Sequence, residues 1–433
     1  MAREYYFISD LHIGGDDQLQ ICDFELELIE FLKKLEYKNK ETELIIIGDA
    51  FGLWELTTAE EAEKLDVIVE HHQELFSQLR RTGERIKITL IPGNHDYELA
   101  CYPEYTEKFG QFNVILEPEV SITREINGKK IWIEHGMQDD AHNHMPDFGN
   151  PHAQPMGYFV THNLVGSAGR MSRFGRYNWL KDIQSVSPME EIPGWMMSNY
   201  FYREMNPLLR YAIAPFLILF NISILYTLGA VLEHLRILPT RIFLDSYLTS
   251  GLGIVGNLLN FVFLVNGIII GILILVSVPL WLFIRDARKT MERFGLLTTK
   301  MILDEQKSSY MAAAQGVFSS HPDVVIYVFG HTHGAFLKRL GNRIVINTGT
   351  WLKILEHLPS RFKWLPDIYW PSFRLNYFRI REEDGKVFIT YRQIDKAAPK
   401  ELSLLQRLAA TRREEPPSIP EETTLEIQES APF

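Results

Sequence analysis

The chain has 433 residues, 46% of them hydrophobic, and carries a formal net charge of −11 at pH 7. This length accommodates a full catalytic domain with an insertion. The acidic balance argues against a general nucleic-acid binder, which would carry a basic face. Cys22 and Cys101 are the two cysteines and show no paired spacing, so a disulfide scaffold is not indicated.

Short apolar runs predict strands along much of the chain. They lie at residues 5–9, 44–47, 86–91, 114–116, 120–124, 131–134 and 324–329, with closing strands at 375–380 and 387–391. Helical periodicity is expected over 23–35 and 59–81, and Asn127-Gly128 and Gly341-Asn342 predict hairpin turns. This alternation predicts an α/β sandwich of two packed sheets with helices outside.

Five short segments place metal-ligand side chains directly after these apolar runs. They contain Asp10 and His12, then Asp49, then Asn94 with His95 and Asp96, then His135, and finally His331 and His333. Carboxylates, imidazoles and a neutral amide oxygen together suit two divalent ions. Two ions about 3.5 to 4 Å apart can acidify a water and clamp both oxygens of an in-line displacement at phosphorus. Asp49 is the best candidate to bridge them, because a strand and a glycine precede it.

The ordered set resembles the calcineurin-like metallophosphoesterases, whose blocks read D-x-H, G-D, G-N-H-D/E, H and G-H-x-H, over residues 3–136 and 322–350. The resemblance implies two divalent ions, with manganese expected and iron, zinc or nickel as alternatives. One ion would be held by Asp10, His12, Asp49 and His333, and the other by Asp49, Asn94, His135 and His331. His95 would lie beside the scissile phosphate as a charge stabiliser or proton donor, oriented by Asp96.

A further block, Gly48-Asp-Ala-Phe-Gly-Leu-Trp54, resembles the UDP-2,3-diacylglucosamine hydrolase branch of these enzymes. That branch typically has an arginine where His95 stands, so the chain departs from it at this position. A histidine there is closer to the general phosphodiesterase and phosphatase pattern.

Two long apolar runs occupy the middle of the chain, at 211–232 and 252–284, without a charged residue in either. About 20 apolar residues span a bilayer core, so we expect a two-helix transmembrane hairpin that interrupts the αββα sandwich. The alternative is a pair of buried helices in a soluble domain. Lys and Arg residues flank the hairpin and are scarce in its loop, which predicts a cytoplasmic catalytic domain. The first strand follows Met1-Ala-Arg-Glu directly, so no secretory signal is expected.

The expected organisation has five parts. They are the first catalytic part at 1–136, a cap or juxtamembrane segment at 137–209, the hairpin at 210–285, the second catalytic part at 286–397 and a disordered tail with at most one short helix at 398–433. Arginines of the cap segment are candidates for contact with a substrate phosphate or lipid headgroups. A second candidate for interfacial contact is the aromatic and basic stretch that includes Trp351, Lys353 and Trp370.

The sequence therefore predicts a membrane-anchored, two-metal phosphoesterase that cleaves a phosphoester or pyrophosphate bond by metal-activated hydroxide. Membrane attachment favours a phosphorylated lipid or lipid-linked substrate, and no nucleic-acid partner is expected. One alternative is a tethered cytoplasmic phosphatase of phosphoproteins or nucleotides. Another is a non-catalytic membrane scaffold that keeps the fold.

Overall fold

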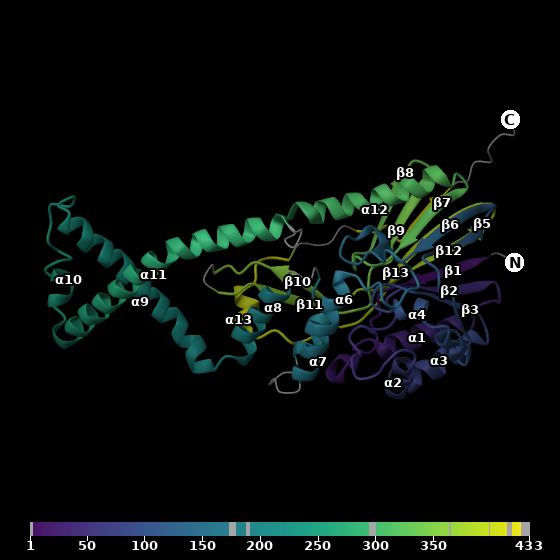
Figure 1. Cartoon of the computed structure of the whole chain (residues 1–433), viewed down its shortest axis with the longest axis horizontal. Coiled ribbons are helices and arrows are strands. Elements are labelled where there is room, and N and C mark those ends of the chain that lie inside the picture. Colours follow the sequence, from purple (N-terminus) through teal and green to yellow (C-terminus); the bar gives the residue numbers. More distant parts are fainter. Residues whose placement is uncertain are drawn as a thin grey trace. The chain divides into compact units, whose positions relative to one another are not determined.

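The computed structural model describes residues 3–172, 179–187, 191–293, 300–362, 365–397, 399–413 and 418–425. The chain divides into two compact units (Figure 1). Unit 1 comprises Met1–Glu204 and Glu305–Phe433, and unit 2 comprises Met205–Asp304. Unit 1 is therefore built from both ends of the chain.

Two mixed β-sheets form the centre of unit 1. The seven-stranded sheet has the order β14 (Glu422–Leu425), β13 (Lys386–Ile394), β12 (Leu375–Glu383), β1 (Glu4–Ile8), β2 (Thr42–Ile47), β3 (Lys87–Ile91) and β4 (Val114–Leu116). The five-stranded sheet has the order β5 (Ser121–Ile126), β6 (Lys129–Glu134), β7 (Val324–Phe329), β9 (Arg343–Asn347) and β8 (Phe336–Leu340). Strands β1 to β4 run parallel in the first sheet, and β6, β7 and β9 run parallel in the second.

The two sheets bury their facing side chains in one apolar core. Phe7, Ile45 and Ile91 come from the seven-stranded sheet, and Ile133 and Val328 from the five-stranded sheet. All five side chains are fully buried. The parallel strands of both sheets are almost wholly apolar because they are covered on both faces.

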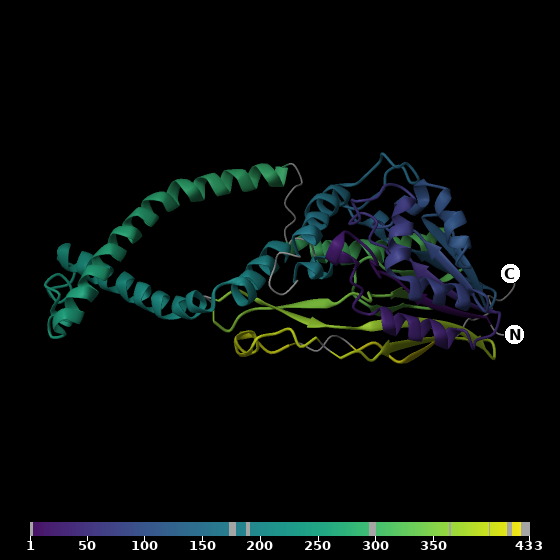
Figure 2. The same ribbon diagram turned by 90° about the horizontal axis from the view of Figure 1, so that it is seen from below.

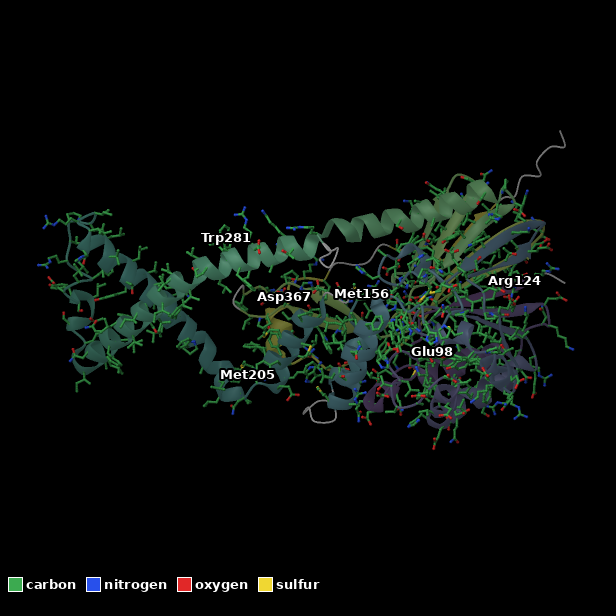
Figure 3. All side chains as sticks on the ribbon, in the orientation of Figure 1. Glu98, Arg124, Met156, Met205, Trp281 and Asp367 are labelled. Carbon is green, nitrogen blue, oxygen red and sulfur yellow. The ribbon has the colours of Figure 1, made fainter. Side chains whose placement is uncertain are left out.

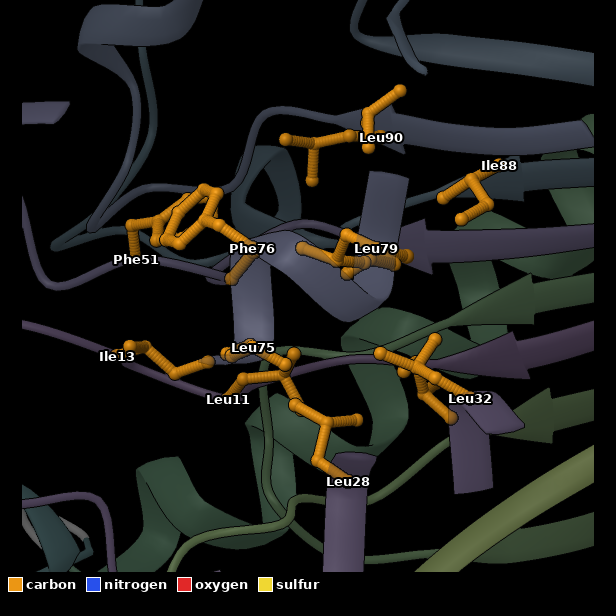
Figure 4. Packing of buried hydrophobic residues seen from close by; sticks show 14 of the residues in the cluster. Leu11, Ile13, Leu28, Leu32, Phe51, Leu75, Phe76, Leu79, Ile88 and Leu90 are labelled. Atoms are coloured by element: carbon orange, nitrogen blue, oxygen red, sulfur yellow. The ribbon is translucent and has the colours of Figure 1, made fainter. Parts of the chain in front are cut away.

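Helices cover the outer face of each sheet. Four helices, α1 (Glu25–Leu35), α2 (Glu63–His71), α3 (Gln73–Gly83) and α5 (Glu104–Gly110), pack on the seven-stranded sheet. Figure 4 shows leucines of α1 and α3 in this packing. Part of α12 (Lys300–Ser320) packs on the five-stranded sheet through Tyr310, Ala314 and Phe318. The predicted α/β sandwich of two sheets with outer helices is thus confirmed.

Two predicted segments differ from the structure. The single helix expected over 59–81 is two helices, because the chain breaks at His72, whose buried ring lies 3.0 Å from Glu25 Oε2 on α1. The expectation of an irregular tail is wrong at β14, which pairs antiparallel with β13. The short helix expected there is α13 (Leu404–Ala409).

The segment between His135 and unit 2 folds onto the sandwich as a set of short helices. They include α6 (Met156–Val160), α7 (Gly166–Ser172) and α8 (Ile192–Asn199). Apolar side chains of α7 and α8 share a cluster with Tyr369 of a two-stranded sheet, β10 (Ile354–Leu358) and β11 (Ile368–Ser372). Nearby Trp351 and Lys353 are buried, so the expected interfacial role of these two residues is wrong.

Unit 2 contains two long helices, α9 (Pro207–His234) and α11 (Gly253–Arg293), that pack together. Asn266 donates a hydrogen bond of 2.9 Å to Ser223 across this contact. Most large apolar side chains of α11 are exposed, and Trp281 among them is labelled in Figure 3.

By length and composition, Gly253–Thr290 is the one helix among the described residues that could cross a membrane; it has a mean hydropathy of 2.8. A core helix of a soluble protein can satisfy the same test. Ile218–His234 is apolar but shorter than such a span. The second membrane helix therefore stays a prediction.

Candidate metal centre

The predicted ligands lie at the carboxyl ends of five strands. Asp10 and His12 follow β1, Asp49 follows β2, Asn94 follows β3, His135 follows β6, and His331 and His333 follow β7. The carboxyl ends of parallel strands meet at one edge of a sheet, which is where open α/β folds place their sites. Packing of the two sheets brings both groups of ligands to one centre.

Five of the ligand residues have backbone φ angles in the left-handed region. The values are 53° at Asp10, 46° at His12, 49° at Asp49, 67° at His331 and 57° at His333. A residue other than glycine adopts this region at a cost, and such residues gather at functional sites where the surroundings fix them. The turns at this edge are therefore shaped to aim side chains inward.

Two glycines allow the loops to approach closely. A Cβ atom on Gly93 would lie 2.2 Å from Oδ1 of Asp49, and one on Gly48 would lie 2.5 Å from Nδ1 of His135. Gly48 also has a φ of +70°. Any larger residue at either position would displace a predicted ligand.

Candidate ligand atoms converge in three groups, of which two consist of predicted ligands and the third joins His12 to Glu55 and His95. Asp10, His12 and His333 each offer a ligand atom, and these atoms lie within 4.8 Å of one another. Asp49, His135 and His331 form a second group that meets the same limit. Asn94 lies beside this second group, with Oδ1 at 3.1 Å from Nε2 of His135.

Asp49 lies between the two groups. Its Oδ2 is 3.7 Å from Nε2 of His12 and 3.2 Å from Nε2 of His135. The charges of the surrounding histidines keep the pKa of Asp49 well below its usual range although its burial opposes ionisation. A buried carboxylate that reaches both groups has the position that a bridging ligand requires.

The polar atoms of this centre fit divalent cations. Oδ1 of Asp10 is buried and accepts no hydrogen bond. Nε2 of His12 and Nε2 of His333 lie 3.2 Å apart. An imidazole nitrogen with a free lone pair can bind a metal ion. Buried acceptors that face one another are costly unless a cation or donor satisfies them. The donor set of imidazole, carboxylate and amide suits manganese, iron, zinc and nickel.

His95 lies at the edge of this centre. Its ring centroid is 4.6 Å from that of His12 and 5.0 Å from that of Trp54. Its Nδ1 lies 2.7 Å from Oε1 of Glu55, a buried carboxylate that sequence reasoning did not single out. Burial would lower the pKa of His95, but the charges of Glu55 and Asp49 raise it to about 9.

The predicted role of Asp96 in orienting His95 is wrong. The Asp96 carboxylate instead accepts hydrogen bonds from four backbone N–H groups, at 3.2 Å from Asp49, 2.7 Å from Ala50, 3.2 Å from Phe51 and 2.6 Å from Gly93. It therefore ties the loop after β2 to the loop after β3. The reason is geometric, because the side chain points back into the turn that carries Asp49.

Asp140 is a second functional carboxylate that the sequence did not reveal. Its Oδ2 lies 2.9 Å from Nε2 of His331 and accepts a hydrogen bond of 2.9 Å from Asn143. Carboxylates that hold a ligand histidine fix its ring orientation. In the sequence, the one indication that Asp140 belongs to this centre is its position five residues after His135.

The cap segment also reaches the centre. A small cavity beside His12 is lined by Gly14 and by Gln184 and Ser185 of the cap segment, and it extends to Lys353. A Cβ on Gly52 would lie 3.2 Å from Oε2 of Glu55 and 3.3 Å from Nε2 of Gln184. Arg170, a predicted phosphate or lipid contact, is engaged instead with Asp16 at 2.7 Å. Arg173 and Arg176, the other arginines of that expectation, lie outside the described residues.

The fold is a two-sheet α/β sandwich, and its centre gathers groups of residues that could hold metal ions. The family model of the calcineurin-like phosphoesterases matches residues 5–219 of the chain. This match supports the calcineurin-like metallophosphoesterase superfamily and metal-dependent phosphoester hydrolysis. No curated protein sequence matches the chain.

Several solved structures are similar to the chain at low identity. A predicted phosphoesterase from Streptococcus pneumoniae is 10% identical, with a TM-score of 0.28 and coverage of 93% of this chain and 95% of that chain. Vps29 complexed with zinc from Entamoeba histolytica is 9% identical, with a TM-score of 0.27 and coverage of 92% and 96%. Vacuolar protein sorting 29 from Cryptosporidium parvum is 10% identical, with a TM-score of 0.28 and coverage of 91% and 92%.

Proposed function

We propose that the protein is a membrane-anchored, two-metal phosphoesterase that hydrolyses a phosphoester or pyrophosphate bond in a lipid or lipid-linked substrate. The convergence of seven ligand residues from five strand ends, with His95 beside them, is the observation that carries the catalytic part of this proposal. The apolar helix of unit 2 supports the membrane part.

Each residue of the centre has a role in this proposal. Asp10, His12 and His333 would hold one ion, Asn94, His135 and His331 would hold the other, and Asp49 would be the ligand that the two sites share. When bound, two divalent ions supply Lewis acidity and lower the pKa of a bound water toward neutrality. Manganese is the expected metal. Asp140 fixes the ring of His331, and Asp96 fixes the turn that presents Asp49.

His95 is the proposed proton donor. Its Nδ1 is engaged by Glu55, so Nε2 is the nitrogen that remains for the substrate. The charges of Glu55 and Asp49 raise the pKa of the ring to about 9, and a protonated ring suits a group that gives a proton to a departing oxygen. The same positive charge would stabilise negative charge that develops on the phosphoryl group.

The membrane part of the proposal is a hairpin formed by α9 and α11. The hydrogen bond from Asn266 to Ser223 supports it, because amides in membrane helices pair across helix contacts. Basic residues flank the hairpin, which favours a catalytic domain on the cytoplasmic side. A water-soluble substrate would not need an anchored centre, so the anchor favours a phosphorylated lipid.

The first test is Mn²⁺-dependent hydrolysis of a chromogenic phosphodiester and the matching monoester by the full chain in detergent. Asp49→Ala should lose both bound metal and activity. His95→Ala should keep its metal and slow turnover by about 100-fold or more. Equal loss of metal in both variants would contradict the proposed division of roles, and metal-loaded wild type without any activity would favour a non-catalytic scaffold.

The second test separates a lipid substrate from a soluble one. The rate with a phosphorylated lipid in mixed micelles should rise with the surface concentration of that lipid at constant bulk concentration. Replacement of residues 210–285 by a soluble linker should preserve turnover of the small ester and reduce turnover of a bilayer substrate. Efficient turnover of a phosphopeptide or nucleotide, independent of the linker, would identify a tethered phosphatase instead.

A further inference from the structure

Helix α13 presents an apolar face to solvent. In this helix the side chains of Gln406 and Ala409 are buried, whereas those of Leu404 and Leu408 are 75% and 59% exposed. The two leucines are four residues apart and so lie on the same side of the helix. A capping box formed by Ser403 and Gln406 closes the first turn of this helix. An ordered helix with its leucines outward calls for an apolar partner.

Helix α8 repeats this arrangement. Trp195 is buried in the cap cluster, while the side chains of Met196, Met197 and Tyr200 are exposed. Met196 and Tyr200 are again four residues apart along a helical segment. Two separate helices of unit 1 thus expose an apolar side.

These two helices lie at the same end of unit 1. Arg203, which follows α8, forms an ion pair of 3.3 Å with Glu401, which precedes α13. The hydroxyl of Tyr202 donates a hydrogen bond of 2.9 Å to the carbonyl of Pro366, in the loop between β10 and β11. Figures 1 and 2 both place α8, α13, β10 and β11 together. We call this region, defined by α8, α13 and the β10–β11 loop, the apolar end.

Several arginines of the apolar end are exposed. Exposed arginines are Arg361, Arg407 and Arg412. The described carboxylates of this region are engaged within the protein: Glu356 with Arg413 at 2.7 Å, Asp367 with His357 at 2.9 Å, and Glu401 with Lys353 at 2.8 Å. Exposed arginines therefore lie in the same region as the exposed leucines and methionines.

We propose that the apolar end docks unit 1 on the surface of a bilayer that contains anionic lipids, an inference that rests on the membrane anchor of the proposed function. Exposed leucines and methionines beside arginines match the acyl boundary and the headgroups of such a surface. The number of residues between the apolar end and the proposed anchor agrees with this docking. Helix α9 begins at Pro207, seven residues after Tyr200, and seven extended residues span at most about 25 Å.

Site-directed spin labelling of the full chain tests this docking. Single cysteines would replace Leu404 and Met197 in a Cys22→Ser, Cys101→Ser background. Tyr37, 89% exposed elsewhere in unit 1, gives the aqueous reference, and Leu275 of α11 gives the membrane reference. Each labelled protein is placed in nanodiscs of phosphatidylcholine with an equal part of phosphatidylglycerol, and in discs of phosphatidylcholine alone. Power saturation then reports contact with oxygen and with a soluble nickel chelate.

In the anionic discs, we expect labels at 404 and 197 to contact nickel several-fold less than the label at 37, and to contact oxygen more. Discs without phosphatidylglycerol should weaken this protection. Arg407→Glu should also weaken it, while Arg80→Glu, the same charge change at an exposed site on α3, should not.

Three results would overturn the proposal. Nickel contact at 404 and 197 equal to that at 37, with Leu275 in lipid, would show an anchored chain whose apolar end is not docked. An aqueous label at Leu275 would show that the anchor itself is absent. Dipolar broadening between labels at 404 would identify a second copy of the chain as the partner instead of lipid.

Discussion

His95 Nδ1 lies 2.7 Å from Oε1 of Glu55, and the other oxygen of this buried carboxylate accepts no hydrogen bond. The pair comes from two loops that the chain separates by 40 residues. Glu55 therefore has both the charge and the geometry to keep the His95 ring protonated and oriented.

Substitution Glu55→Gln removes that charge and keeps the side-chain shape. We expect kcat to fall by about 10- to 100-fold, since general acid catalysis contributes 10²- to 10⁴-fold and the ring would lose part of it. Metal content should stay unchanged. The measurement is steady-state hydrolysis of a chromogenic ester together with metal analysis. The control is Glu60→Gln, which changes an exposed carboxylate nearby. Unchanged kcat in Glu55→Gln would rule out this role.

Gly93→Ala tests the close approach of two loops. The added methyl would lie 2.2 Å from Oδ1 of Asp49, so Asp49 must move or the loop must shift. We expect bound metal and activity to fall together while circular dichroism stays that of the folded protein. Gly110→Ala is the matched control, because a Cβ there meets nothing within 4 Å. Full metal content in Gly93→Ala would show that the loop relaxes without cost to the site.

Asp140→Asn tests the support of His331. The carboxylate fixes the imidazole ring, and loss of such a partner typically weakens metal binding by about 10- to 100-fold. Titration of metal-depleted protein with Mn²⁺ should therefore give a weaker affinity for at least one ion. Asp139→Asn changes the neighbouring carboxylate and should bind metal as the wild type does. Equal affinities in both variants would leave Asp140 with a structural role only.

The ligands were predictable because each lies in a short motif that directly follows an apolar strand. Asp49 and His135 could be assigned from such local patterns. Glu55 and Asp140 could not, because their partners are set by how separate loops approach after the sheets pack. The same reason explains the error at Asp96, where proximity in sequence to His95 gave the wrong hydrogen-bond partner. The helix break at His72 likewise depends on a contact with another helix.

The cap segment was the least predictable part of unit 1. Its short helices have no long apolar period, so no strand or helix was predicted over 137–204. Burial of Trp351 and Lys353 was also invisible from composition, because aromatic and basic residues occur both at membrane interfaces and in buried charge clusters. Tertiary packing decides between these two environments.

Lys353 holds the cap segment and α13 to the sandwich through a buried charge cluster. Its Nζ lies 2.9 Å from Asp182, 3.2 Å from Asp23 and 2.8 Å from Glu401. Lys353→Met would leave the buried Asp182 with only a 3.7 Å contact to Lys181, and breaking a buried ion pair typically costs about 3 to 5 kcal/mol. We expect a lower midpoint of thermal unfolding, while Lys338→Met, an exposed lysine on β8, should leave the midpoint unchanged.

The same cluster sets a pH dependence. Burial raises the pKa of Asp182, whereas for Asp23 and Glu401 burial is outweighed by the charge of Lys353, which holds their pKa values below the ordinary ones. The two lowered carboxylates decide the expected direction. A carboxylate with a lowered pKa in the folded state adds stability above its unfolded pKa, about 4, and loses it as the pH falls through the folded value. The temperature midpoint of wild-type unfolding should therefore fall as the pH is lowered below about 4. Lys353→Met should start from a lower midpoint and show a smaller fall over the same pH range. An equal acid drop in both proteins would place the responsible carboxylates outside this cluster.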